Sequence, residues 1–235
     1  MKRLMPIFIV ILLSGCGILT AYAPNMLSMI VVAVMGVVVL LGIIYGLIPV
    51  LTFTQGLLTG QKSIQRASEA EEKSVWITAL QMDRFFRQKK MDQLFREYRD
   101  KVKQQRQNGQ IVSDLEDILN EDVLALYSWQ GVVAQIPGTL TGLGILGTFI
   151  GLLRGLRNIN FVTVEAALSS VQSILTGIDI AFYTSIAGVI LSILFNISNN
   201  ILRNTMDREM GIFLEVFHRV VLPTTQEQER YRSRR

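Results

Sequence analysis

Apolar residues are concentrated in four long stretches of this chain of 235 residues. Residues 5–23, 27–54 and 132–153 contain no charged side chain, and residues 171–197 contain only Asp179. A helix needs roughly 20 residues to cross about 30 Å of hydrocarbon, so each stretch is close to that length or exceeds it. The pattern therefore predicts four transmembrane helices in an all-α integral membrane protein.

Charges between the stretches predict the orientation and the layout. Lys2 and Arg3 precede the first stretch and Lys62 and Arg66 follow the second, so the positive-inside rule places the chain start and the middle section in the cytoplasm. The second hairpin then returns the arginine-rich C-terminus to the cytoplasm as well. The expected layout is a first hairpin (1–60), a cytoplasmic helical insert (61–129), a second hairpin (130–203, outer loop 158–170) and a cytoplasmic tail (204–235).

Composition supports a membrane class, since 50% of the residues are hydrophobic and the mean hydropathy is +0.37. The formal net charge of +4 then belongs to loops beside anionic lipid, and we expect no nucleic acid as a partner.

Apolar residues also recur at helical spacing inside the insert. They are Met91, Leu94, Phe95, Tyr98 and Val102, and they predict a helix with one packed face. The rest of this helix and its approach carry a basic face that we expect to be solvated near lipid headgroups, formed by Arg84, Arg87, Lys89, Lys90, Arg96, Arg99, Lys101, Lys103 and Arg106.

Helix-breaking and helix-capping residues predict where the helices begin and end. Asn108-Gly109 is expected to end the helix of the insert. Ser113 and Glu116 have the spacing of a capping box, which predicts a new helix running into the third span with a boundary at Pro137.

The last helix is predicted to be very long. Thr163 is a plausible N-cap, Glu165 suits the first turn, and no proline follows before Pro223. At 1.5 Å per residue such a helix reaches roughly 85–90 Å, so we expect it to project from the membrane into the cytoplasm as a rod.

The residue inventory argues against an enzyme. Cys16 and His218 are the only cysteine and histidine, so no disulfide forms within one chain, and we expect no metal site and no cofactor. No Ser-His-acid set, phosphate-binding loop or paired carboxylates are visible. Residues 13–16 also allow a lipoprotein signal cut before Cys16, but the second apolar run favours a plain transmembrane helix.

Small and hydroxyl residues recur every three or four positions on the third and fourth apolar stretches. Such spacing favours close helix packing, because small residues let backbones approach. The hydroxyls of Thr148 and Ser185 lie at similar depth, each six residues from Arg154 and Asp179 respectively. An antiparallel register with Thr148 opposite Ser185 then predicts an Arg154–Asp179 ion pair, serving either structure or an ion entrance. The packing seam is assigned to Gly144, Gly147, Gly151, Gly177, Ala181 and Gly188.

Two segments resemble the MotA/TolQ/ExbB proton-channel family. Residues 136–151, IPGTLTGLGILGTFIG, are similar to its Leu-Gly-Thr element on a pore-lining helix, and residues 181–188, AFYTSIAG, to the partner element. Family members usually carry threonine three residues before the final glycine, where this chain has Ser185 with Thr184 beside it, so either hydroxyl could face the pore. The layout is like a flagellar stator, and residues 147–152, GTFIGL, look most like the A subunit of Zorya phage-defence motors, which usually has a much longer tail.

The resemblance implies an A subunit of an ion-driven motor in the bacterial inner membrane. Five copies would surround a dimeric B subunit with one transmembrane helix and an intramembrane aspartate. The implied ion is a proton, although the hydroxyls could serve sodium as well. The alternatives are a flagellar-stator-like or TonB/Tol-type energiser subunit and a non-conducting membrane scaffold whose glycine seams only pack helices. The implied ion path comprises Thr148, Ser185, Thr184, Thr141 and Asp179.

Overall fold

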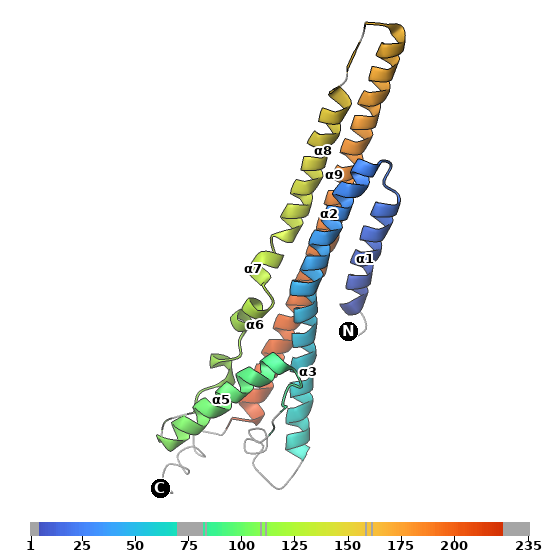
Figure 1. The fold of residues 1–235 in the computed structure, drawn as a ribbon. Helices are drawn as coiled ribbons and strands as arrows, with labels where there is room; N and C mark the ends of the chain where they lie inside the picture. Colours follow the sequence, from blue (N-terminus) through green and yellow to red (C-terminus); the bar gives the residue numbers. More distant parts are fainter. Residues whose placement is uncertain are drawn as a thin grey trace. The chain divides into compact units, whose positions relative to one another are not determined.

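The computed structural model describes residues 5–69, 82, 84–108, 110, 112–157, 159–160 and 162–222. Every regular element among these residues is a helix, so the prediction of an all-α protein is confirmed (Figure 1). Parts of the predicted layout lie outside the described residues, namely the basic N-terminus, residues 70–81 of the insert, Gly109, parts of the outer loop, and the tail from Pro223.

Three helical stretches are long and apolar enough to cross a membrane. The first, Met26–Arg66, joins α2 (Met26–Gly42) to α3 (Ile48–Glu69) through the π-helical turn η1 (Ile43–Leu47). The second, Gln130–Leu156, contains α7 (Gln130–Val133) and α8 (Ile136–Leu156), and the third is α9 (Val164–Val220). The apolar helix α1 (Met5–Ala21) has 17 residues, so a fourth span through it stays a prediction.

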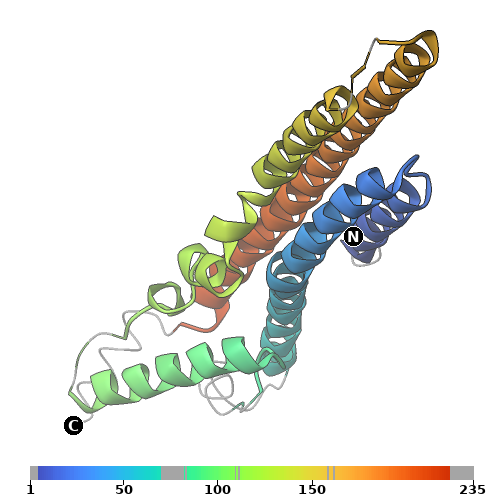
Figure 2. The same cartoon turned by 45° about the horizontal axis from the view of Figure 1, so that its top comes forward.

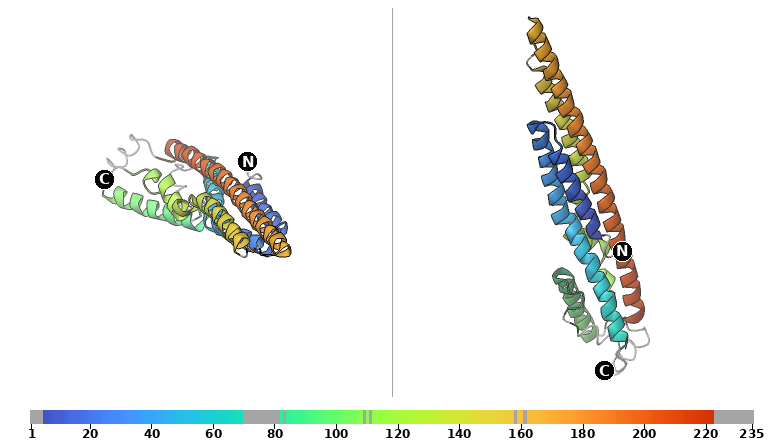
Figure 3. Two further views of the ribbon diagram at one scale, coloured as in Figure 1. Left: turned by 90° about the horizontal axis from the view of Figure 1, so that it is seen from above. Right: turned by 90° about the vertical axis from the view of Figure 1, so that its right-hand side faces the viewer.

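The chain divides into two compact units, each described by itself. The first consists of Met1–Ile48 and Trp129–Ile201, and in it α1, α2, α8 and the first part of α9 pack side by side (Figures 2 and 3). Tyr183 on α9 donates a hydrogen bond to the Leu19 carbonyl on α1. Gly42 on α2 lies in close contact with α8 and α9, because a Cβ there would lie 2.5 Å from the side chains of both Ile136 and Phe195.

The second unit, Pro49–Ser128 and Leu202–Arg235, has an aromatic core. Its helix α5 (Lys89–Gln107) buries the five apolar residues that the spacing predicted. Phe85 stacks on Phe95 at 4.4 Å between ring centroids, and Phe86 meets Phe213 of α9 edge-on at 5.2 Å. Because these rings come from segments far apart in sequence, the aromatic core holds the unit together.

The basic face of α5 is mostly exposed, as expected. Arg99 and Lys101 are half-buried instead, and Lys101 reaches Asp117 at 3.6 Å. Lys90 lies over the Tyr127 ring, 4.6 Å from its centroid. These contacts are individually weak, so the face remains a solvated surface.

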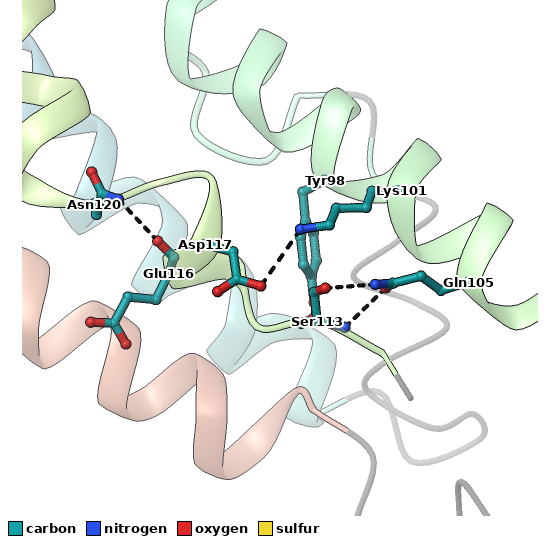
Figure 4. A network of polar contacts seen from close by, with 7 residues as sticks. All are labelled: Tyr98, Lys101, Gln105, Ser113, Glu116, Asp117 and Asn120. Carbon is teal, nitrogen blue, oxygen red and sulfur yellow. Dashed lines mark hydrogen bonds and ion pairs between the residues drawn. The ribbon is translucent and has the colours of Figure 1, made fainter. Parts of the chain in front are cut away.

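The predicted capping box at Ser113 and Glu116 is wrong. The Ser113 backbone N–H donates to Gln105 Oε1 at 2.9 Å, and its hydroxyl accepts from Gln105 Nε2 at 2.6 Å (Figure 4). The Tyr98 hydroxyl donates to the Ser113 carbonyl at 3.1 Å, and burial, helped by Asp114 and Asp117, raises the pKa of Tyr98 so that it stays a donor. Ser113 is therefore held by α5 and does not cap a helix.

No single helix runs from this segment into the membrane stretch. A short 3-10 turn, η2 (Leu115–Asp117), precedes α6 (Glu121–Tyr127), where Asn120 Oδ1 accepts from the Val123 N–H at 3.0 Å as the actual N-cap. Trp129, with a left-handed backbone (φ 51°), then separates α6 from α7.

Two predicted boundaries are confirmed. Pro137 lies in the first turn of α8, where its missing N–H costs nothing. Thr163 caps α9, because its Oγ1 accepts from the Ala166 N–H at 3.1 Å. From there α9 continues for 57 residues, as the absence of proline predicted.

Replacing Phe213 with alanine tests the aromatic core. Phe213 is fully buried among Phe85, Phe86 and Phe217, so the cavity left behind should cost about 3–5 kcal/mol. Thermal unfolding of the purified chain, followed by helical circular dichroism, measures this. Ile212→Ala is the matched control, because Ile212 is 43% exposed on the same helix. Equal losses for the two variants would contradict the assigned core.

Candidate functional site

The candidate site is the hairpin of α8 and α9, whose backbones approach closely at glycines. A Cβ on Gly151 would lie 2.7 Å from the Gly177 carbonyl oxygen, and one on Gly188 would lie 2.7 Å from the Leu140 carbonyl oxygen. Gly155 also faces Gly177, with 3.1 Å to its Cα. Small residues follow this line of close approach, which we call the glycine seam: Gly144, Gly147, Gly151, Gly155, Gly177, Ala181, Thr184 and Gly188.

Thr184 is the hydroxyl inside the glycine seam. It is fully buried, and a Cβ on Gly147 would lie 2.6 Å from the Thr184 Cβ. Its Oγ1 donates within its own helix, where the carbonyls of Ile180 and Ala181 lie at 2.9 Å and 3.2 Å. Thr184 therefore packs the hairpin in this chain and offers little to a second molecule.

Thr148 and Ser185 flank the seam on its open side. Thr148 lies four residues after Gly144 and three before Gly151, and Ser185 has the same spacing from Ala181 and Gly188. At 3.6 residues per turn, each hydroxyl is rotated by about 50° from the seam in the same sense. Because the two helices are antiparallel and face each other, the same rotation brings both hydroxyls to one side.

That side of the hairpin is accessible in the chain. Thr148 and Ser185 are half-buried, and no hydrogen bond joins them; Thr148 donates to the Ile145 carbonyl of its own helix. Two exposed aromatic residues that the sequence analysis overlooked, Phe149 (60%) and Phe182 (66%), lie beside them. The signal available in the sequence was a large aromatic residue among the small residues of each helix.

Two further predicted ion-path residues have different surroundings. Thr141 is half-buried and donates to the Pro137 carbonyl at 3.1 Å. Asp179 lies midway between Gly177 and Ala181, both of which face α8, so it points away from the hairpin partner.

Arg154 and Asp179 form no ion pair within this chain, and both side chains are exposed. Gly147, not Thr148, lies against Thr184, so the register also differs by about one residue on each helix from the one that the pairing assumed. An Arg154–Asp179 pair between neighbouring chains stays a prediction.

Among the described residues, no group of three or more His, Cys, Asp or Glu side chains is arranged to hold a metal ion.

These features define a class of helical protein that combines helices long and apolar enough to span a membrane with a close-packed hairpin. The chain belongs to the ZorA-like family: the family described as "Anti-phage protein ZorA, Zorya type I system" matches residues 12–205, which include the entire glycine seam. The resemblance to Zorya A subunits is thereby confirmed.

Two relatives named "Zorya protein ZorA" are similar over 60 residues each. One, from Escherichia coli strain Crooks, is 45% identical, and the other, from Escherichia coli O139:H28 strain E24377A, is 43% identical. The matched stretch is 26% of this chain and 10% and 8% of those relatives, so the chain spans only a small part of their length.

Replacing Gly151 with alanine tests the glycine seam. The added methyl group would meet backbone atoms of α9 at 2.7 Å and 2.8 Å, which cannot rotate away, so the hairpin should open and the melting temperature should fall. Gly142→Ala on the same helix has no atom within 4 Å and should be neutral or stabilising by up to about 1 kcal/mol. Thermal unfolding in detergent compares the two; a neutral Gly151→Ala would refute the close approach.

Proposed function

We propose that this chain is the A-type subunit of a proton-driven membrane motor that acts in defence against phage. Five copies form a ring around a dimeric B subunit, each of whose chains contributes one membrane helix with an aspartate. Membership of the ZorA-like family supports the defence role. The observation that carries the ion-path assignment is the placement of Thr148 and Ser185 on one open side of a rigid hairpin.

In the proposed assembly, the open side of α8 and α9 faces the ring axis. Thr148 and Ser185 are only half-buried and Phe149 and Phe182 are exposed, so no other described part of the chain covers this side of the hairpin. The B-subunit helix is the proposed neighbour.

The proposed mechanism uses hydroxyls as reversible partners of the B-subunit carboxyl. A proton arriving from the outside neutralises that aspartate, which then hydrogen-bonds to Thr148 and Ser185 of one copy. Loss of the proton to the cytoplasm releases this contact, and the ring steps to the next copy. The chain itself performs no covalent chemistry and needs no cofactor in this proposal.

The proposed topology is four spans in the bacterial inner membrane, with α1 as the first and both termini in the cytoplasm. The second unit then stands on the cytoplasmic side with the rod of α9. Its basic α5 face is exposed, as a surface close to anionic headgroups requires.

Thr148→Val and Ser185→Ala test the ion path. Valine keeps the shape of threonine without its donor, and a lost hydrogen bond costs about 0.5–1.5 kcal/mol, with more for an unsatisfied carboxyl. Both variants should assemble with the B subunit but lose most proton flux and phage protection. Flux into reconstituted vesicles and plaque counts measure the two readouts.

Two matched variants sharpen this test. Thr184→Val changes the neighbouring hydroxyl, which is sealed in the seam and should leave proton flux largely intact. Ser192→Ala alters a half-buried hydroxyl further along the same stripe and should be neutral. Full flux in Thr148→Val and Ser185→Ala would instead favour the scaffold function, in which the seam only packs helices.

A further inference from the structure

Trp129 occupies an unusual position in the first unit. Its backbone is left-handed (φ 51°, ψ 34°) although it is not a glycine. This conformation is energetically unfavourable for a residue with a side chain. Its side chain is 60% exposed, so burial in this chain does not offset that cost. The indole lies beside Tyr45 of η1, with 6.4 Å between ring centroids, and Tyr45 is 55% exposed.

The exposed apolar surface of the α2 helix ends at this aromatic pair. Beyond Ile48 the described part of α3 exposes no large hydrophobic side chain, and its exposed positions are Gln55, Lys62, Gln65 and Arg66. Before that point, exposed large hydrophobics follow the whole length of the helix: Met26, Met29, Ile30, Val34, Val37, Leu40, Leu41, Ile44, Tyr45 and Ile48. The exposed side chains thus change from apolar to polar just past Tyr45.

Two exposed charged side chains of the first unit, Arg154 and Asp179, define a second level. Gly42, Ile136 and Phe195 lie at one height, because a Cβ on Gly42 would lie 2.5 Å from both side chains. Met26, at the start of α2, lies sixteen residues from Gly42, and Asp179 on α9 lies sixteen residues from Phe195. On α8, sixteen residues from Ile136 lead to Leu152, which lies two residues before Arg154.

The separation of the two levels equals the thickness of a membrane core. Sixteen residues rise by about 24 Å, and the three residues from Gly42 to Tyr45 add about 4–5 Å. The sum of about 28–29 Å matches the hydrocarbon thickness of about 30 Å. Met26, Gly42, Tyr45 and Asp179 belong to the first unit, whereas the polar positions of α3 belong to the second.

We infer that Tyr45 and Trp129 form an aromatic anchor at the lipid headgroup boundary on the α3 side of the membrane. Indole and phenol rings favour this zone, because their bodies enter the acyl region while the N–H and O–H groups stay hydrated. Transfer of the Trp129 ring into that zone offsets its backbone cost. The inference requires a membrane but does not depend on the proposed motor.

The same boundary places other parts of the first unit outside the hydrocarbon. Asp179 and Arg154 lie at the opposite headgroup level, where exposed charges are hydrated.

Tryptophan fluorescence in lipid vesicles tests the anchor. The chain has two tryptophans, so Trp76→Phe leaves Trp129 as the sole indole in the full chain. Vesicles contain phosphatidylcholine brominated either near the headgroup or near the chain ends, and iodide serves as the aqueous quencher. A matched reference carries Trp76→Phe, Trp129→Phe and Val37→Trp, which puts the indole on α2, eight residues or about 12 Å deeper than Tyr45.

Trp129 should be quenched most by bromine near the headgroup, whereas the indole at position 37 should be quenched most by bromine near the chain ends. Strongest quenching of Trp129 by the deep bromines would overturn the boundary. Quenching by iodide alone would place the ring in water and overturn it as well. Absence of quenching by either lipid or iodide would show that protein, such as a second copy of the chain, covers Trp129, which also contradicts the inference.

Discussion

The close backbone contact between α8 and α9 is the constraint on which the rest of the first unit depends. At Gly151, Gly177 and Gly188 the two helices leave no room for a methyl group. In lipid there is no hydrophobic driving force between helices, so close packing of this kind must supply much of the association energy. The contact fixes the rotation of both helices, and this rotation decides which side chains face outward.

One consequence is that two neighbouring hydroxyls have different surroundings. Thr184 and Ser185 are adjacent in sequence, but a single helical step of about 100° seals the first in the seam and leaves the second half-exposed. In the proposed motor, a rigid hairpin that presents Thr148 and Ser185 on one side suits a site that binds and releases a partner repeatedly. A flexible pair would lose that geometry at each step.

Much of this architecture could be predicted from the sequence, because hydrophobic runs and helix caps are local signals. The apolar stretches, the Thr163 cap, the Pro137 boundary and the buried face of α5 all follow from spacing along the chain. The capping box at Ser113 failed because Gln105, eight residues earlier, competes for the same groups through a tertiary contact. The register of the hairpin also depended on which glycine meets which backbone atom, which residue numbers alone do not determine.

In the proposed assembly, the open sides of five α8–α9 hairpins surround the helices of the partner. A density map of this chain purified in lipid with the B subunit tests it most directly. The account predicts a closed ring of five copies in which Thr148 and Ser185 of each copy face a central axis occupied by helices of the partner. A map in which these hydroxyls face lipid, or pack only against helices of their own or a neighbouring copy, would contradict the account.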